Sequence, residues 1–217
     1  MQLLNAIEVR VLGALLEKEI TTPEYYPLTA NALVNACNQK SSRDPVVQYD
    51  EDTVLQALDS LREKGLTLRI TGAGHRVEKF GHRLGETLNL GRRELALLCV
   101  LMLRGPQTVG ELRQRTERLA RFDSLAEVEQ VLRLLASRED PLARRLERAP
   151  GQKEARWVEL FSGEAAALEA AARTERVDDD EPEPARPRSA TDALRDEVAA
   201  LREEVAALRE QIRALLE

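Results

Sequence analysis

The segment DEDTVLQALDSLREKGLTLRITGAGHRVEKFGHRL, residues 50–84, decides the fold of this chain. After Asp50 its apolar residues recur every three to four positions, which is the spacing of an amphipathic helix. Beyond Gly65 the period changes to two in residues 66–70, and a return strand is expected over residues 77–84 after a glycine-rich turn. A helix that leads directly into a β-hairpin predicts a small unit of mixed α and β structure.

Two further helices precede this segment and complete a first unit. Apolar residues recur at helical spacing over residues 6–19, and Asn5 with Glu8 three positions later has the pattern of a capping box. Another helix is expected over residues 29–38. Three helices followed by a hairpin is the element order of a winged helix-turn-helix, so residues 1–90 are predicted to form one such domain.

The same order of elements returns in the next stretch of the chain. A nearly all-apolar helix is expected over residues 92–103, and Thr108 and Ser124, each with Glu three positions later, have capping-box spacing at the starts of two more helices. An alternating stretch then predicts a second hairpin. The chain is therefore expected to be mainly α with small β-hairpin wings (an α+β fold), built from tandem winged-helix domains at residues 1–90 and 91–162.

The C-terminal quarter differs in composition. Residues 163–189 combine an alanine-rich helical stretch with clustered acids and prolines, which is typical of a linker. Over residues 190–217 apolar residues alternate at intervals of three and four, with Val or Ile at heptad position a and Leu at position d, which favours a parallel two-stranded coiled coil. The expected dimerisation residues are Leu194, Val198, Leu201, Val205, Leu208, Ile212 and Leu215.

The charged flanks of this repeat agree with a parallel pair. Glu197 and Glu204 occupy position g, and Arg202 and Arg209 occupy position e, so each acid would meet an arginine of the partner helix. The alternative is a single amphipathic helix that folds back on its own chain. We expect a homodimer.

Charge is unevenly distributed along the chain. Residues 91–162 carry 14 Lys and Arg against 11 Asp and Glu, whereas residues 163–217 carry 8 against 15. The third helix of the first unit is acidic outside, but its hairpin is basic, and the second unit has arginines on two helices and its hairpin. Such residues contact phosphate without sequence choice. The candidate nucleic-acid contacts are Arg76, Lys79, Arg83, Arg113, Arg115, Arg118, Arg133, Arg144, Arg145, Arg148 and Lys153.

These cations have an alternative interpretation as solvated surface charge. Acids are interleaved with them, and Glu111 with Arg115 and Glu117 with Arg121 have the spacing of i,i+4 ion pairs on a helix. DNA is therefore a possible partner, and so is another protein.

A polar segment between the second and third helices of the first unit is a second candidate site. It is either a recognition loop or a loop that satisfies its own backbone groups, as Asn and Ser side chains readily do. Its residues are Asn35, Asn38, Gln39, Lys40, Ser41, Ser42 and Arg43.

No pattern in the sequence indicates catalysis. There is no glycine-rich phosphate loop, no metal-spaced His and Cys cluster and no nucleophile with a paired base. Cys37 and Cys99 lie in apolar helical patterns and are expected to be buried, reduced thiols. With no signal peptide and no apolar run long enough for a membrane span, the expectation is a cytoplasmic protein that is not an enzyme, needs no cofactor and does not contact a membrane.

Several motifs stand out in the first three quarters of the chain: YPLTANALVNACNQKSSRDP at residues 26–45, LGALLEKE at 12–19, KFGHR at 79–83, and the stretches 94–108 and 110–112. They closely resemble the YceH family of bacterial proteins. The resemblance covers roughly residues 1–162 and implies a tandem winged-helix fold without an established activity. The acidic linker and heptads are less typical of the family, so dimerisation through the tail need not be a family property.

Two hypotheses of different classes follow. One is a DNA-associated protein, such as a regulator, that uses the second unit and both hairpins. The other is a protein-interaction scaffold of the type of the bacterial chromosome-segregation protein ScpB, which is a comparison of fold alone. The basic middle third favours DNA, whereas the acidic third helix of the first unit favours the scaffold.

Overall fold

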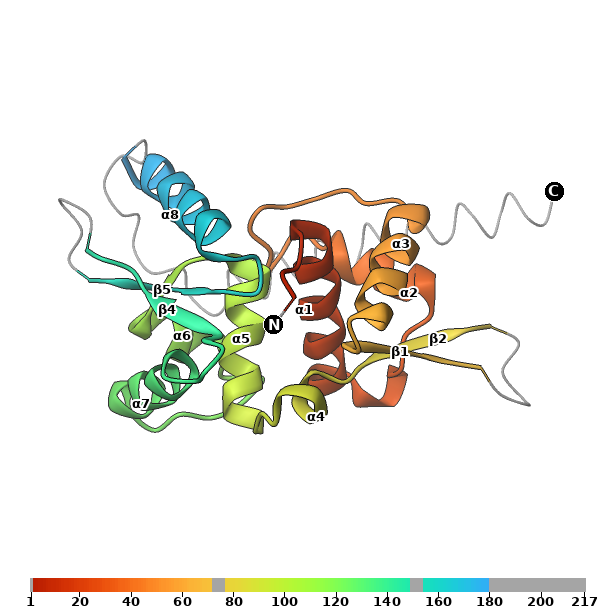
Figure 1. Cartoon of the computed structure of the whole chain (residues 1–217), viewed down its shortest axis with the longest axis horizontal. Coiled ribbons are helices and arrows are strands. Elements are labelled where there is room, and N and C mark those ends of the chain that lie inside the picture. Colours follow the sequence, from red (N-terminus) through yellow and green to blue (C-terminus); the bar gives the residue numbers. More distant parts are fainter. Residues whose placement is uncertain (1, 72–76, 149–153, 180–217) are drawn as a thin grey trace, which may run out of the picture. The chain divides into compact units, whose positions relative to one another are not determined.

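Helix α1 (Ala6–Thr21) lies between α5 (Arg92–Arg104) on one side and α2 (Ala30–Cys37) and α3 (Glu51–Glu63) on the other (Figure 1). The structure is a computed structural model that describes residues 2–71, 77–148 and 154–179. The helix begins at the expected capping box, in which Asn5 Oδ1 accepts from Glu8 N at 2.9 Å and Glu8 Oε2 accepts from Asn5 N at 2.7 Å. Leu12 and Leu15 are fully buried because α1 packs against both α3 and α5.

The first half contains the three helices and the hairpin that the sequence predicts. Asp50 caps the third helix, since its carboxylate accepts from Thr53 N at 2.8 Å. The hairpin strands are antiparallel, and Leu28 adds an isolated antiparallel bridge to Phe80 on the second strand. The elements after α1 are η1 (Pro23–Tyr25), α2 (Ala30–Cys37), α3 (Glu51–Glu63), β1 (Thr67–Ile70), β2 (Lys79–His82) and α4 (Leu84–Leu88).

The second half repeats this order. The first strand pairs with the third and the third with the second, so a three-stranded antiparallel sheet forms in the order β3-β5-β4. Trp157 on the last strand is buried in the core. The elements are α5 (Arg92–Arg104), β3 (Gln107–Thr108), α6 (Val109–Arg115), α7 (Leu125–Ala136), β4 (Ala143–Arg145), β5 (Arg156–Glu159) and α8 (Glu164–Asp179). The mixed class, mainly helical with small antiparallel sheets, is confirmed.

Some local expectations were wrong or incomplete. Strand β3 and helix α4 were not predicted, because two and five residues are too few to show a period. At the start of α7 the Glu127 carboxylate accepts from Asp123 N instead of Ser124 N, so this capping box is only half formed. The expected Glu117–Arg121 ion pair is absent from the described contacts: α6 ends at Arg115, and Arg121 pairs with Asp123 at 3.3 Å.

The two halves share one hydrophobic core within residues 1–176. Helix α5 lies alongside α1 (Figure 1), and Gly13 marks a close approach of the two. A Cβ atom at Gly13 would lie 3.0 Å from Leu103 Cδ2 and 3.2 Å from Met102 Cβ. Cys99 is buried at the same crossing and its thiol donates to Gly13 O at 3.7 Å.

Part of the sequence-based prediction concerns residues that lie outside the described ranges. These are Arg76, Lys153, the acidic end of the linker and the whole heptad segment 190–217. The coiled coil and its dimer therefore stay predictions.

Candidate functional site

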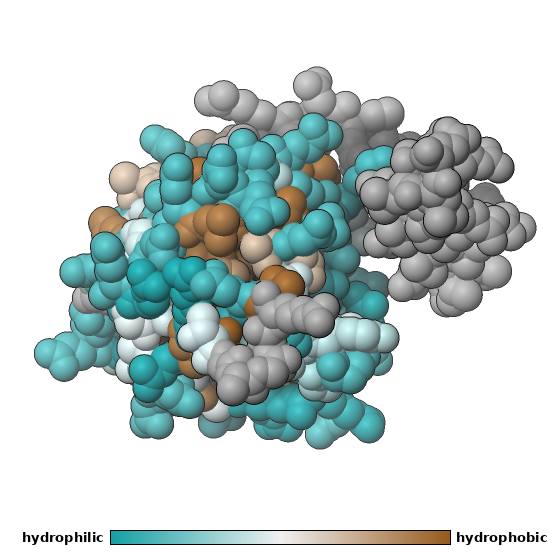
Figure 2. Space-filling model, turned by 90° about the vertical axis from the view of Figure 1, so that its right-hand side faces the viewer, coloured by the Kyte–Doolittle hydropathy of each residue, from teal (hydrophilic) through white to brown (hydrophobic). Residues whose placement is uncertain are grey.

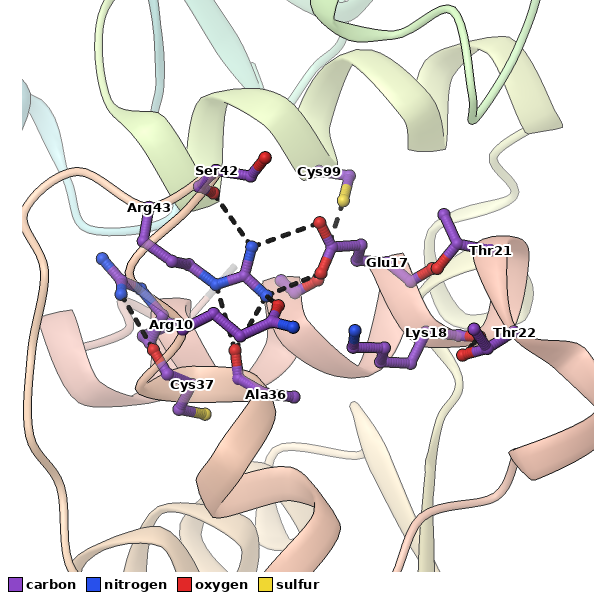
Figure 3. A network of polar contacts seen from close by, with 12 residues as sticks. Arg10, Glu17, Lys18, Thr21, Thr22, Ala36, Cys37, Ser42, Arg43 and Cys99 are labelled. Carbon is purple, nitrogen blue, oxygen red and sulfur yellow. Dashed lines mark hydrogen bonds and ion pairs between the residues drawn. The ribbon is translucent and has the colours of Figure 1, made fainter. Parts of the chain in front are cut away.

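The polar loop between α2 and α3 turns a charged side chain into the protein. Arg43 is buried, and its guanidinium forms a two-pronged ion pair with Glu17 of α1, at 2.6 Å and 3.1 Å (Figure 3). The same group donates to Ala36 O at 2.8 Å and to Gln39 Oε1 at 2.9 Å. Charge-assisted, two-pronged bonds are the strong class of hydrogen bond, so Arg43 ties the loop to both α1 and the end of α2.

Two more side chains close the loop. Asn38 donates to Tyr49 O at 2.8 Å and accepts from Tyr49 N at the same distance. Arg10 of α1 donates to Cys37 O at 3.1 Å and to Pro45 O at 2.7 Å. Burial raises the pKa of the Cys37 thiol to about 12, so this thiol is neutral at physiological pH.

The tip of the loop contacts the second half. Arg104, the last residue of α5, donates to Ser42 Oγ at 2.7 Å. The backbone N–H of Asp44 donates to Leu103 O at 2.9 Å, which satisfies a carbonyl in the last turn of α5. Ser42 has φ 58°, a left-handed conformation uncommon for a non-glycine residue.

The other predicted loop residues lie nearer the surface. Asn35 is exposed and donates to Asn31 Oδ1 at 3.0 Å. Ser41 and Lys40 are also exposed. Most of the polar atoms that the sequence singles out here are thus engaged inside the fold.

The predicted nucleic-acid contacts do not form one surface cluster of free cations. Several have a structural partner: Arg83 (Glu86), Arg113 (Phe122 O and Asp123 O), Arg115 (Glu111), Arg133 (Glu129) and Arg144 (Glu164). The Glu111–Arg115 pair is the expected i,i+4 pair, with its charged atoms 3.2 Å apart. Within the described part of the chain, the side chains of Lys79, Arg118, Arg145 and Arg148 make no hydrogen bond or ion pair.

A shallow hollow of about 370 Å³ brings together arginines that the sequence analysis did not group. Arg92 and Arg93 come from the start of α5, and Arg118 and Arg121 from the segment between α6 and α7. Glu117 is the acid among its lining residues. No sequence pattern connects the two pairs of arginines, since about 25 residues separate them. The two adjacent arginines at the start of α5 were the one feature of the sequence that pointed to this site.

Local contacts hold the hollow in shape. Arg92 Nε donates to Leu119 O at 3.0 Å, which fastens the segment after α6 to α5. The Arg93 guanidinium lies 5.6 Å from the centre of the Phe122 ring, within cation–π range. We call the set Arg92, Arg93, Arg118 and Arg121 the arginine face.

The third helices of the two halves carry different surfaces. On α3, the exposed side chains include Asp52, Gln56, Asp59 and Glu63, and Arg62 pairs with Asp59 at 3.1 Å. On α7, Leu125 and Leu134 are 50% and 55% exposed. Figure 2, turned so that the right-hand side of Figure 1 faces the viewer, shows a mainly hydrophilic surface with several hydrophobic side chains near its middle.

Among the described residues, no three His, Cys, Asp or Glu side chains are grouped as metal ligands would be. In the same part of the chain, no helix combines the length and the apolar character of a bilayer span.

The model of the family described as "Protein of unknown function, DUF480" matches residues 4–152. The chain belongs to the DUF480 family. The resemblance to the YceH family is thereby confirmed, because YceH is a member of it.

Relatives with the family-level name UPF0502 protein are similar over most of the chain. That of Opitutus terrae is 59% identical over 161 residues, which is 74% of this chain and 70% of the relative. That of Solibacter usitatus is 59% identical over 169 residues, 78% of this chain and 81% of the relative. The UPF0502 protein GSU0233 of Geobacter sulfurreducens is 55% identical over 162 residues, 75% and 74% of the two chains.

The DUF480 match includes both candidate regions. The polar loop and the arginine face lie inside residues 4–152, whereas α8 and everything after it lie beyond the matched segment. A DUF480 function is therefore to be sought in the two packed halves.

Proposed function

We propose that this DUF480 protein is a non-enzymatic, cytoplasmic protein that associates with the phosphate backbone of duplex DNA through its arginine face. Its two halves are in this proposal tandem winged-helix domains. The hollow between the start of α5 and the segment after α6, with four arginines and one acid on its walls, is the observation that carries the proposal.

The arrangement of strands supports the winged-helix assignment. In the second half a short strand after the first helix pairs with the last hairpin strand, which gives the order β3-β5-β4. In the first half Leu28 occupies the corresponding place after α1, and its bridge to Phe80 corresponds to the β3–β5 pairing. Both halves thus follow the order helix, short strand, two helices, hairpin, which is the order expected of a winged helix-turn-helix.

Two members of the arginine face, Arg118 and Arg121, are available to meet phosphate. The side chain of Arg118 has no hydrogen bond or ion pair with the described residues, and Arg121 pairs only with Asp123, whose side chain is 67% exposed. Arg92 is bonded to Leu119 O, and Arg93 pairs with Glu127 at 3.7 Å. Exposed ion pairs contribute about 0–1 kcal/mol, so a DNA phosphate can replace the carboxylate. Arginine is also suited to two-pronged phosphate contacts.

The proposal does not include recognition of a particular DNA base sequence. A recognition helix would need polar donors toward base edges, but α7 exposes the apolar side chains of Leu125 and Leu134. The exposed acids of α3 would repel phosphate. We therefore expect binding to be salt-dependent and nearly independent of sequence.

Fluorescence anisotropy with a random-sequence duplex, titrated with the full chain at several salt concentrations, tests this. We expect the double variant Arg118→Ala/Arg121→Ala to bind more weakly and to lower the slope of log K against log salt by about 1.8, since each phosphate contact contributes about 0.9. Arg62→Ala is the matched control, because Arg62 is an exposed arginine paired with a nearby acid on α3. Absence of DNA binding by the unmodified chain at low salt would refute the proposal.

A protein-interaction scaffold is the second candidate function. The exposed Leu125 and Leu134 on α7 favour it, because an apolar pair on the outer face of a third helix suits a protein surface better than a DNA groove. A photo-crosslinking amino acid at position 134 would form a protein adduct in cells, and one at the exposed position 83 would not. No adduct at position 134 would count against a scaffold.

Dimerisation through residues 190–217 is part of the proposal and is tested separately. Two copies joined by a coiled coil would raise the avidity of a weak DNA contact. Light scattering of the full chain would show a dimer whose fraction rises with concentration and falls in Leu201→Asp. A monomer at high concentration would exclude it.

A further inference from the structure

A second, smaller cavity lies where the polar loop meets the second half. Its volume is about 30 Å³. One ordered water requires about 10–15 Å³, so the cavity has room for two or three oxygen atoms. It is bordered by Glu17 of α1, by Ser42 of the polar loop, by Arg104 of α5 and by the arginines Arg115 and Arg118 of α6 and the segment after it.

The carboxylates near this cavity already form ion pairs with other residues. Glu17 is bonded through both oxygens to Arg43. Glu111 is bonded to Arg115 at 3.2 Å and to Arg156 at 3.0 Å, so two cations share one charge. Neither of these acids makes an ion pair with Arg104 or Arg118 among the described contacts.

Arg104 and Arg118, beside Arg115, therefore form a local excess of positive charge. The one described hydrogen bond of the Arg104 side chain goes to a neutral oxygen, Ser42 Oγ. Burial lowers the pKa of Arg104 most, and the neighbouring charges of Arg115, Arg43 and Arg118 lower it further, against an opposing effect of Glu17. Like charges held together in a partly desolvated place are unfavourable unless an anion joins them.

We propose that this cavity binds the phosphate group of a small phosphorylated molecule or inorganic phosphate, held by Arg104, Arg115 and Arg118. Guanidinium groups match phosphate oxygens in geometry and charge. The cavity has room for only part of a phosphate group, so its remaining oxygens and the rest of the ligand would lie on the solvent side, past the exposed Arg118.

Occupation of this site would connect α5 to α6 and the segment after it, inside the second half. Arg104 also donates to Ser42 Oγ of the polar loop, so the site lies where the second half meets the first. A phosphate between them adds contacts that exist only in the folded state, so binding stabilises the fold. The two proposed sites share Arg118, but Arg92, Arg93 and Arg121 border only the hollow of the arginine face, and Arg104 and Arg115 border only this cavity.

Thermal unfolding and calorimetric titration of the full chain with inorganic phosphate test the site, with sodium chloride at equal ionic strength as reference. At a phosphate concentration ten times Kd, we expect the unfolding midpoint to rise by about 3–6 °C. Arg104→Gln abolishes this rise, and Arg118→Ala, which removes an exposed side chain without a described partner, reduces it. An equal shift with chloride, or a full shift in both variants, overturns the proposal.

Further variants separate this site from the proposed DNA contact. Arg121→Ala is expected to weaken duplex binding and to keep the response to phosphate, whereas Arg104→Gln is expected to do the reverse. If duplex DNA displaces phosphate and loses affinity in Arg104→Gln, the cavity takes a DNA phosphate, and the small-molecule site is refuted.

Discussion

Arg43 and Glu17 form a buried ion pair between the polar loop and α1, with Nη2 and Oε2 2.6 Å apart and none of the Arg43 side chain exposed. The carbonyl of Ala36 and the amide oxygen of Gln39 take further hydrogens of the same guanidinium. The shape of the loop, and with it the position of Ser42 against α5, depends on this pair.

Removing one partner of this pair is expected to cost more than removing both. Glu17→Leu leaves the Arg43 charge buried without its carboxylate, and we expect the free energy of unfolding to fall by about 3–5 kcal/mol. In the double variant Glu17→Leu/Arg43→Met no charge is left unpaired, so the loss is smaller. Urea unfolding of both single variants and the double variant measures this; additive losses would contradict it.

The α1–α5 crossing predicts opposite effects for two glycines in helices. Gly13→Ala brings a Cβ atom to 3.0 Å from Leu103 Cδ2, so we expect destabilisation of about 1–3 kcal/mol despite the better helix propensity of alanine. At Gly110 in α6 the nearest atom, Thr108 Oγ1, is 3.9 Å from such a Cβ. Gly110→Ala is therefore neutral or stabilising by up to about 1 kcal/mol. Thermal unfolding compares the two; equal effects would show that the crossing accommodates a methyl group.

His82 makes the stability of the first half depend on pH. Its Nδ1 accepts from Leu84 N at 3.2 Å, so the ring proton lies on Nε2, which faces Glu19 Oε2 at 2.8 Å. A second proton would point at the Leu84 N–H. Burial lowers the pKa of His82 below its usual 6.5, against the opposing charge of Glu19.

The unfolded chain takes up a proton on His82 at a higher pH than the folded chain does. Below pH 6.5 the unfolded chain binds a proton that the folded chain does not, so stability falls as pH is lowered from 7 toward 5.5. Urea unfolding across this range measures the slope. His82→Asn, whose amide oxygen can replace Nδ1 as acceptor, should remove most of it, while His75→Gln serves as the control. An unchanged slope in His82→Asn would rule out His82 as its source.

Glu8 has two roles where α1 begins. It caps α1 and also pairs with Lys64 after α3 at 2.5 Å while only 1% exposed. Burial would raise the pKa of Glu8, but hydrogen bonds from Lys64, Ser60 and the backbone of Asn5 together lower it below 4.5. The stabilisation is thus present above pH 4.5 and is lost as pH falls through the folded-state pKa.

Substitution of Glu8 should therefore cost more than that of an ordinary capping glutamate. We expect Glu8→Gln to lower the free energy of unfolding by about 1–3 kcal/mol at pH 7, because the buried Lys64 pair is lost. Glu94→Gln is the matched control: Glu94 accepts from Gly91 N at 2.8 Å at the start of α5 without a described lysine partner. Equal losses at pH 7, or a Glu8→Gln loss that persists unchanged at low pH, would contradict the expectation.

In the candidate sites, contacts within one helix follow from the sequence, whereas contacts to other segments do not. Arg115 was expected to pair with Glu111, and it does, because the two residues share one helix face. Arg113, also a candidate DNA contact, is instead bonded to the Phe122 and Asp123 carbonyls, which lie beyond the end of α6. Of the arginine face only Arg118 was a candidate, since Arg92 and Arg118 meet only through the packing of α5 against the segment after α6.

The sequence by itself determined the local structure and the duplicated order of this protein. The capping boxes at Asn5 and Thr108 and the helix-to-hairpin change after Gly65 involve residues a few positions apart, so composition and period are sufficient to predict them. Only the tertiary structure decided which charges are buried and which remain available. Arg43 finds Glu17 across 26 residues, and Ser42 meets Arg104 across 62. Such pairs depend on how helices pack, and no periodic pattern in the chain records them.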